Sequence, residues 1–401
     1  MKRGISLFLA IVMGVLLILP FTKTPFNVLV NAANEEYLTF TLNEDGESYS
    51  VGSSNEEIIG DIVIPSTYNG LPITVIREEA FIGCDNITSV TISEGIKTIG
   101  FSAFSQCDNL RKVELPESLT SIGHNAFNFC ANLTTLNLPS NLTEIGRNIV
   151  GNTAYFNDPN NWTDDMLVVN GYIIAIENDC TVCTIGADIK LLSYRIFDSC
   201  GALKEIVVDE NNEVFASADG VLFNKAKTKL IKYPKCKSEI EYTLPDTVEC
   251  IGERAFSGSV NLTSINIPDG VEFIGVGAFS GCTSITELKF PDSVKSIEQG
   301  AFTGCTNLET VNLPNGITRI NEYIFQNCSS LITVNIPESV TCIGSGAFLS
   351  CKKLEHIVIP EGVTDIDDCA FMYCDNLESV NIPNGVTHIG QQAFRDCVKI
   401  T

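Results

Sequence analysis

The stretch LITVNIPESVTCIGSGAFLSCKK, residues 331–353, decides the fold because its pattern returns every 23 residues along most of the chain. The clearest marker is a phenylalanine that follows alanine or isoleucine. It stands at Phe81, Phe104, Phe127, Phe197, Phe256, Phe279, Phe302, Phe325, Phe348, Phe371 and Phe394. Internal repeats of this length predict a solenoid, in which each unit covers its apolar face with its neighbours.

One unit divides into three parts. Residues 331–336 show the apolar alternation of a half-buried strand, and Pro337 ends that run because it cannot donate a ladder hydrogen bond. A second short strand is expected at 340–343. We expect Gly344 to allow a sharp turn into one helical or 3₁₀ turn that carries the alanine, phenylalanine and cysteine of residues 347–351. The fold class is therefore a β-rich repeat solenoid of 23-residue units with short parallel strands.

This unit resembles the leucine-rich repeat of the BspA-like type found in microbial surface proteins, and the resemblance covers residue 35 onward. It implies a non-enzymatic protein with adhesion to host cells, extracellular matrix or other microbes. One unit departs from the pattern, because Ile149-Val150 stands where a phenylalanine is expected. We expect that coil to be distorted.

The amino terminus has the features of a secretory signal peptide. Lys2-Arg3 precedes the apolar residues 5–20, and small residues at 30–33 suit cleavage. An uncleaved transmembrane anchor is the alternative, although the apolar run is shorter than the roughly 20 residues that span a bilayer. The expected location is secreted or at the cell surface, with no membrane insertion after cleavage.

The exported chain is strongly acidic. Removing residues 1–33 takes away three basic side chains and no acidic one, so the formal net charge falls from −24 to −27. Such a charge disfavours nucleic acid and anionic membranes as partners, since both need a basic surface. An acidic surface also serves solubility.

Sixteen cysteines would suggest disulfides in an exported chain, but ten of them follow the repeat. They are Cys84, Cys107, Cys130, Cys200, Cys282, Cys305, Cys328, Cys351, Cys374 and Cys397. We expect an internal ladder of small buried side chains, mostly reduced, because parallel side-chain vectors disfavour the disulfide dihedral near 90°.

The order of units predicts five regions. They are a signal peptide (1–33), an N-terminal β cap with the start of the first coil (34–80), leucine-rich repeats (81–150), repeats interrupted by two hairpin insertions (151–250) and regular repeats (251–401). The hairpins are expected at Asn170-Gly171 and Asp219-Gly220. Because Ile400 starts a further coil that has no polar cap, we expect truncation at this end and self-association through the open coil.

Catalytic and metal sites find little support, and no cofactor is predicted. His124, His356 and His388 occupy three different repeat offsets and should not converge. Cys180-x-x-Cys183 has the spacing of half a metal site, but structural cysteines or a local disulfide are the alternative. The polar stretches 158–165 and 209–213 lack the spacing of a calcium loop and are interpreted as ordinary loops.

Two surfaces are candidates for ligand binding. One consists of lysines on the second hairpin, Lys225, Lys227, Lys229 and Lys232, which could present a cationic edge to a sulfated glycan, acidic polymer or protein. Protection of an exposed strand edge is the alternative. The other is a polar ladder at one outward strand offset, formed by Asn137, Asn266, Asn312, Asn335 and Asn381. Any solvated strand could show the same polarity.

The sequence and the resemblance together favour a binding scaffold, adhesin-like, for an extracellular protein or glycan. Two alternatives remain open at this point. The repeats could be a targeting or spacer region of a larger secreted enzyme, or a self-associating surface-layer component.

Overall fold

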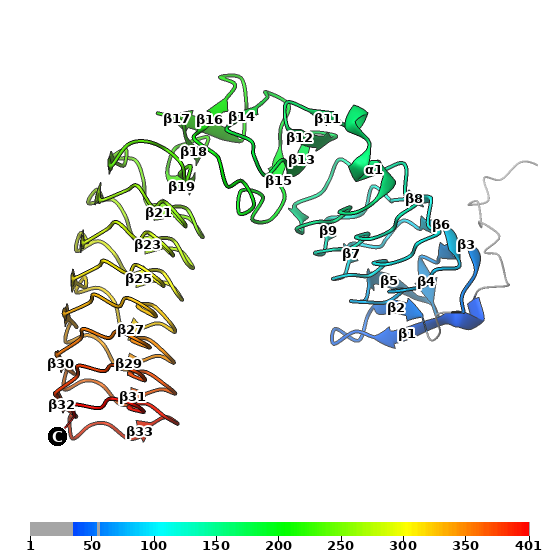
Figure 1. Cartoon of the computed structure of the whole chain (residues 1–401). Helices are drawn as coiled ribbons and strands as arrows, with labels where there is room; N and C mark the ends of the chain where they lie inside the picture. The colour runs from blue at the N-terminus through cyan, green and yellow to red at the C-terminus, as the bar shows by residue number, and fades with distance from the viewer. Residues whose placement is uncertain (1–34, 54–56, 401) are drawn as a thin grey trace, which may run out of the picture.

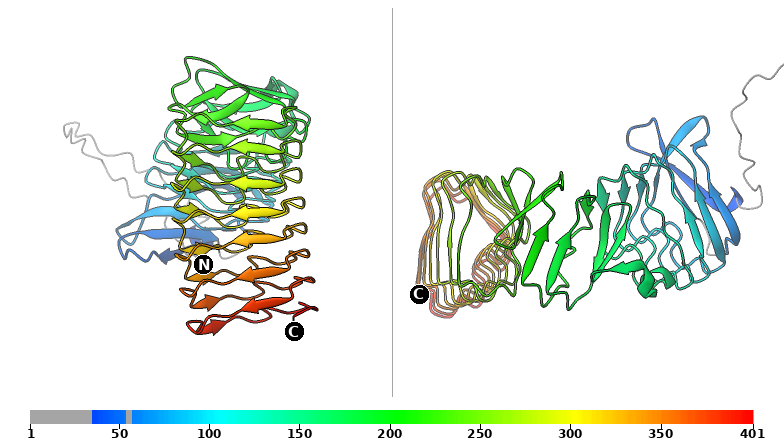
Figure 2. Two further views of the ribbon diagram at one scale, coloured as in Figure 1. Left: turned by 90° about the vertical axis from the view of Figure 1, so that its left-hand side faces the viewer. Right: turned by 90° about the horizontal axis from the view of Figure 1, so that it is seen from above.

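The computed structural model describes residues 35–53 and 57–400, and the predicted signal peptide lies outside these residues. The chain coils into a solenoid that bends into an arch (Figure 1). One arm is formed by the coils before residue 151, the other by the coils after residue 240, and the residues between them form what we call the bend. Figure 2 shows the stacked coils of the C-terminal arm from the side and from above.

Each regular coil contributes one strand to each of two parallel ladders. The outer ladder follows the outside of the arch, as β30 (His356–Val358) and β32 (Ser379–Asn381) show in Figure 1, and the inner ladder lies on the side that faces the space under the arch. Equivalent residues of successive coils pair: Thr310 opposes Thr333 in the outer ladder, and Cys342 opposes Asp365 in the inner one. The predicted short parallel strands are confirmed.

The N-terminal arm begins with an antiparallel hairpin. Its inner sheet holds β1 (Leu38–Leu42), β2 (Tyr49–Ser53), β4 (Thr67–Tyr68), β5 (Leu71–Ile76), β7 (Thr98–Ile99), β9 (Ser121–Ile122) and β10 (Glu144–Ile145). Its outer sheet holds β3 (Gly60–Ile64), β6 (Ile87–Ile92) and β8 (Lys112–Glu114). The described helices are short: η1 (Glu35–Tyr37), α1 (Ala154–Asn157) and η2 (Pro159–Asn161).

Two further hairpins lie within the bend, and the second of them leads into the C-terminal arm. The bend holds β11 (Trp162–Thr163), β12 (Met166–Val169), β13 (Tyr172–Ile176) and β15 (Leu191–Leu192), with β14 (Val182–Ile185) and β16 (Glu205–Val208) in a second sheet. The next inner sheet holds β17 (Phe215–Ala218), β18 (Val221–Asn224), β19 (Lys229–Lys232), β21 (Cys250–Ile251), β23 (Phe273–Ile274) and β25 (Ser296–Ile297).

The remaining strands complete the C-terminal arm. The inner ladder continues with β27 (Arg319–Ile320), β29 (Cys342–Ile343), β31 (Asp365–Ile366) and β33 (His388–Ile389). The outer ladder holds β20 (Glu241–Thr243), β22 (Ser264–Asn266), β24 (Glu287–Lys289), β26 (Thr310–Asn312), β28 (Thr333–Asn335), β30 and β32.

The inner ladder therefore starts three times, each time next to an antiparallel hairpin. In each case the last strand of an antiparallel hairpin pairs in parallel with the first regular strand: β2 with β5, β13 with β15, and β19 with β21. The predicted turns are present, because Asn170-Gly171 and Asp219-Gly220 both have positive φ at their two central residues, as a type I′ turn requires. The two inserted hairpins thus serve as internal caps.

The segment around each buried phenylalanine was expected to form one helical or 3₁₀ turn, and it consists of single turns with hydrogen bonds of the 3₁₀ type. In the coil of Phe348, the N–H groups of Ala347, Leu349 and Cys351 donate to carbonyls three residues earlier. The N–H groups between them, those of Gly346, Phe348 and Ser350, donate to the next coil at 2.8–2.9 Å. The alternation ties each coil to its neighbour, so no helix can continue.

The role expected for Gly344 was wrong in its detail. Gly344 does not have a positive φ; the left-handed residues in this coil are Gly346, with φ +58°, and Ser350, with φ +63°. At Gly344 the constraint is space, because an added Cβ would lie 2.8 Å from the carbonyl oxygen of Ile320 in the preceding coil. The distortion expected at Ile149-Val150 is also absent: Phe127 and Phe129 donate regular inter-coil bonds to Ile149 and Gly151.

The core is continuous within each arm and divided at the bend. Three buried clusters cover residues 38–174, 166–222 and 221–393, and each starts near one of the three hairpins. Inside the arms the phenylalanine rings stack, with centroids 4.9 Å apart for Phe81 and Phe104 and 5.1 Å for Phe348 and Phe371. Because the core is divided at the bend, the regular stacking of coils is interrupted there.

Candidate functional site

Two neighbouring cavities lie on the inner side of the bend and share the wall formed by Leu191, Leu192 and Tyr194. We call them the acidic cavity, about 530 Å³, and the basic cavity, about 370 Å³, and together the bend groove. They lie where the inner ladder is interrupted, because β10 and β15 belong to different sheets, and so do β15 and β19. Regular pairing would have closed both spaces.

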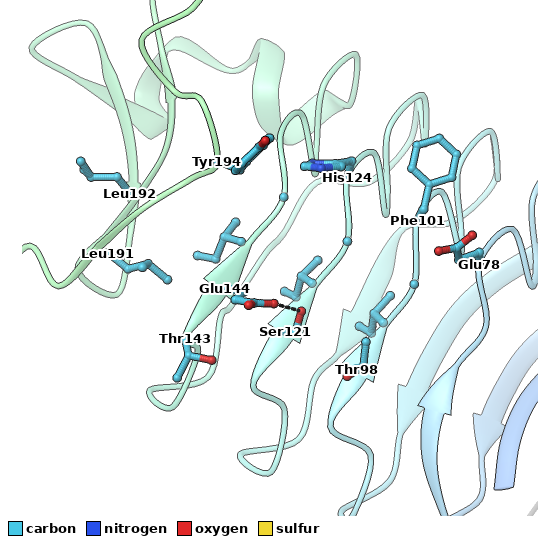
Figure 3. Close-up of a pocket in the computed structure, with 16 residues that line it drawn as sticks. Glu78, Thr98, Phe101, Ser121, His124, Thr143, Glu144, Leu191, Leu192 and Tyr194 are labelled. Carbon is cyan, nitrogen blue, oxygen red and sulfur yellow. Dashed lines mark hydrogen bonds between the residues drawn. The ribbon is translucent and has the colours of Figure 1, made fainter. Parts of the chain in front are cut away.

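The acidic cavity presents aromatic rings and carboxylates. Figure 3 shows Phe101, His124 and Tyr194 along one side, with Glu78 and Glu144 also on the wall. Phe101 is 39% exposed and Tyr194 41% exposed, so both rings are accessible to a partner. None of the residues that line this cavity is lysine or arginine.

Local contacts fix the orientation of this wall. The Ser121 hydroxyl donates to Glu144 at 3.1 Å, and Nδ1 of His124 accepts the N–H of Arg147 at 2.8 Å. The His124 and Tyr194 rings lie 5.0 Å apart. The side chains come from successive coils at the same repeat offset, so the solenoid itself aligns them.

The basic cavity combines an apolar surface with an excess of positive charge. Its basic side chains are Arg195, Lys229, Lys232 and Arg254, against the two carboxylates of Asp198 and Glu253. Leu191, Leu192, Ile196, Phe197, Phe215 and Ile231 supply most of the apolar lining. In a chain with 25 basic and 49 acidic residues, this is a local reversal of charge.

A set of polar contacts bridges the bend across the basic cavity. Glu253 accepts from the Tyr194 hydroxyl at 2.9 Å and from Nε of Arg195 at 2.8 Å. Nε of Arg254 lies 3.0 Å from the Asp198 carboxylate. Burial and the hydrogen bond to Glu253 raise the pKa of Tyr194. These contacts, which we call the bracket, hold the second arm against the bend.

Lys232 is not part of an exposed cationic edge, and that prediction was wrong. Only 4% of its surface is exposed, and its Nζ donates to the carbonyl oxygen of Arg254 at 3.0 Å. Burial lowers its pKa to about 8. The alternation of β19 turns Lys229 outward and Lys232 into the interior.

Lys225 and Lys227 do not share a strand face with Lys229 either. Both lie in the turn between β18 and β19, and Lys227 has φ +54°. The Lys225 ammonium donates to the carbonyl oxygens of Glu210 and Asn212, which ties it to the neighbouring loop. The lysines predicted to form one cationic edge therefore occupy three places. Lys225 and Lys227 lie in a turn, Lys229 is exposed beside the basic cavity, and Lys232 is buried.

The predicted asparagines are exposed at equivalent positions, away from the bend groove. Asn312 pairs with Asn335, but Asn266 pairs with Thr243 and Asn381 with Val358. The ladder is thus mixed, and Val358 is 72% exposed. Asn137 lies outside a described strand, and its Oδ1 accepts from Asn170 of the first inserted hairpin at 3.0 Å.

The remaining candidates do not form a reactive site. His356 and His388 lie on different ladders, far along the chain from His124 in the bend groove. Cys180 and Cys183 are buried, and Sγ of Cys183 contacts Sδ of Met166 at 3.5 Å. Among residues 35–53 and 57–400, no group of three histidine, cysteine or acidic side chains is placed to hold a metal. The same residues contain no helix long and apolar enough to cross a membrane.

Sequence reasoning missed the bend groove itself. Phe101, His124, Tyr194 and Glu253 all stand three residues before the buried phenylalanine of their coils. Reading this offset along the chain would have revealed a row of aromatic and charged side chains. The cavities could not be predicted from the sequence, because they depend on how two inserted hairpins interrupt the inner ladder.

The comparisons with known proteins agree with this architecture. The description "BspA type Leucine rich repeat region" matches in six copies, over residues 55–162, 232–294 and 273–401. These ranges leave out most of the bend. No curated protein matched the chain.

The chain is similar to several solved structures. A leucine-rich repeat protein from Eubacterium ventriosum is 24% identical, with 91% of this chain and 94% of that chain covered and a TM-score of 0.56. A leucine rich cell surface protein from Faecalibacterium prausnitzii is 25% identical over 79% and 92% of the two chains, with a TM-score of 0.45. The pneumococcal vaccine antigen PcpA is 22% identical over 82% and 92%, also at 0.45. With more than half of its residues matched by the family description, the chain belongs to the BspA type leucine-rich repeat family.

Proposed function

We propose that this protein is a secreted or cell-surface binding protein, adhesin-like, that engages an extracellular protein or glycan through the bend groove. The observation that carries the proposal is the pair of open cavities of opposite charge that share Tyr194 on the inner side of the bend. Export is supported by the signal-peptide pattern at residues 1–33, and a binding role agrees with a family of repeat proteins.

The groove has the physical features of a recognition surface. Protein interfaces are enriched in tyrosine, phenylalanine and arginine, and the residues that contribute most lie in preformed, desolvated pockets. Phe101, Tyr194 and Arg195 are of these types, and the coils and the bracket hold them in place before any partner arrives. A rigid concave scaffold lowers the ordering cost of binding.

The test is binding of the exported chain to immobilised matrix proteins and a glycan panel, across a salt series. Two matched variants locate the contact: Phe101→Ala in the groove, and Phe273→Ala on the inner ladder of the C-terminal arm, where the ring is 40% exposed. We expect saturable binding at physiological salt, at least tenfold weaker for Phe101→Ala and unchanged for Phe273→Ala, because a central aromatic anchor contributes about 1.4 kcal/mol or more.

A third variant, with Lys225, Lys227 and Lys229 changed to glutamine, asks whether the lysines of the second hairpin add to this contact. Equal losses for both phenylalanine variants would move the site away from the groove. Folded protein without saturable binding would overturn the proposal in favour of a spacer in a larger enzyme, or of a surface-layer component if the chain assembles with increasing concentration.

A further inference from the structure

Lys232 brings a positive charge into the wall of the basic cavity. In the described part of the chain it forms no ion pair, and the hydrogen bond to the Arg254 carbonyl oxygen uses one of its three N–H groups. The Asp198 carboxylate, which lines the same cavity, is taken by the Arg254 guanidinium at 3.0 Å. A buried charge is costly unless an opposite charge compensates it. Lys232 therefore offers the basic cavity an ammonium whose charge an anionic ligand could compensate.

The other residues that line the basic cavity indicate what kind of molecule would carry the anionic group. Ile196, Phe215 and Ile231 give the cavity apolar walls, while Lys229 adds a second, exposed ammonium. A fitting ligand carries a small negative group next to an apolar body. Acidic sugars present hydroxyls around their carboxylate and would leave them facing these aliphatic and aromatic walls without hydrogen bonds.

The backbone beside the cavity favours an extended peptide. Leu191 and Leu192 line the cavity and form β15, which is the end strand of its sheet. An end strand presents unpaired N–H and C=O groups that can pair with an added strand, as in the recognition of extended peptides by sheet edges. A sugar cannot satisfy a strand edge in this regular way.

We propose that the basic cavity binds the C-terminal carboxylate of a protein partner whose last side chain is apolar. Lys232 receives the carboxylate, the apolar walls receive the last side chain, and the preceding residues run along β15. This assignment rests on the proposed binding function and narrows it to a class of partner. It uses only groups already in place, since the bracket fixes Arg195 and Arg254 in contact with their own carboxylates.

The experiment compares fluorescent hexapeptides that end in leucine with either a free carboxylate or an amide, titrated into the exported chain and followed by anisotropy. Lys232→Met removes the charge and keeps an apolar stem of similar length, so the variant should fold. Lys289→Met, on the outer ladder far from the groove, is the matched control. Oligogalacturonate serves as the acidic-sugar probe.

We expect saturable binding of the free-acid peptide, at least tenfold weaker binding of the amide, the same loss in Lys232→Met and no change in Lys289→Met. The inference is overturned if acid and amide bind equally, if Lys232→Met binds like the original chain, or if oligogalacturonate binds and the peptide does not. If the peptide fails while the matrix and glycan panel still shows binding sensitive to Phe101→Ala, only this inference falls. If neither binds, both fall.

Discussion

Cys351 donates a hydrogen bond from its Sγ to the carbonyl oxygen of Phe325 in the preceding coil, across 3.2 Å. The same relationship, with 26 residues between donor and acceptor, links Cys107 to Phe81 and Cys282 to Phe256. The repeated cysteine is therefore more than a small apolar filler. The Phe325 carbonyl also accepts the N–H of Cys328 in its own coil at 3.0 Å, so the thiol adds a second hydrogen bond, between coils, to an oxygen that the backbone uses once.

Ser259 occupies this ladder position and does not achieve the bond. Its Oγ is buried without a hydrogen-bond partner, the one such side-chain atom among the described residues. The hydroxyl is shorter than a thiol, so we predict that Ser259→Cys reaches the carbonyl of Tyr233 and stabilises the protein by about 1 kcal/mol. Thermal unfolding measures the change. Ser259→Ala should also be neutral or stabilising, because it removes an unsatisfied group, and a lower melting temperature for both variants would contradict the argument.

The ladder thiols should stay reduced in the folded protein. None of the sixteen cysteines, all of which lie among the described residues, forms a disulfide, and burial raises the pKa of Cys282 and of Cys328 to about 12, so both remain thiols at neutral pH. We predict slow reaction with a thiol reagent in the native state, with the partly exposed cysteines labelled first; these are Cys236, Cys250, Cys342, Cys369 and Cys397. Under denaturing, non-reducing conditions most should react. If fewer than half of the sixteen did so, disulfides would be present after all.

Two glycines of the N-terminal arm are required for different reasons, Gly146 for close packing and Gly83 for its backbone conformation. A Cβ at Gly146 would lie 2.3 Å from the backbone nitrogen of His124, whereas one at Gly83, where φ is +68°, would meet no atom within 4 Å. Gly146→Ala should cost about 2 kcal/mol by pushing coils apart, and Gly83→Ala about 1 kcal/mol for its left-handed conformation. Chemical denaturation compares them. A larger loss of stability for Gly83→Ala than for Gly146→Ala would show that inter-coil spacing is not what excludes a side chain at Gly146.

The repeat pattern was sufficient for the fold because each inward residue recurs at a fixed offset. Phe348 and Cys351 are fully buried as expected, and the strands pair in the expected register. Gly344 was misread because glycine at a turn suggests a special φ, while its actual constraint comes from a neighbouring coil 23 residues away. A single sequence does not reveal which of these two reasons applies.

The site was less predictable because it arises from an interruption of the repeat. Lys229 and Lys232 look alike in the sequence, but the alternation of β19 turns Lys229 outward and Lys232 into the interior. Tyr194 and Glu253 are 59 residues apart and meet because two inserted hairpins bring their coils together. The hairpins themselves were visible from Asn170-Gly171 and Asp219-Gly220, but not the direction in which they turn the arms.

Lys232 should destabilise the folded chain at neutral pH, and Lys232→Met tests this. Its pKa falls from an ordinary 10.5 to about 8, because burial, Lys235 and Arg254 outweigh the opposing effects of Asp198 and Cys282. Below pH 8 the folded and unfolded chains both carry the charge, and the folded chain bears the full cost of burying it. Between pH 8 and pH 10.5 the folded lysine loses its proton first, so that cost shrinks, and above pH 10.5 it is gone.

Lys232→Met should therefore raise the free energy of unfolding by about 2 kcal/mol at pH 7, after the lost hydrogen bond to Arg254 is counted, and the gain should vanish near pH 10.5. Comparing the two proteins at each pH cancels the titration of the tyrosines and cysteines that they share. Lys289→Met should show no such trend. A variant less stable than the original chain at pH 7, by a margin independent of pH, would mean that Lys232 contributes packing and not a buried charge. A charge retained at a cost in stability is what a binding site for an anion requires.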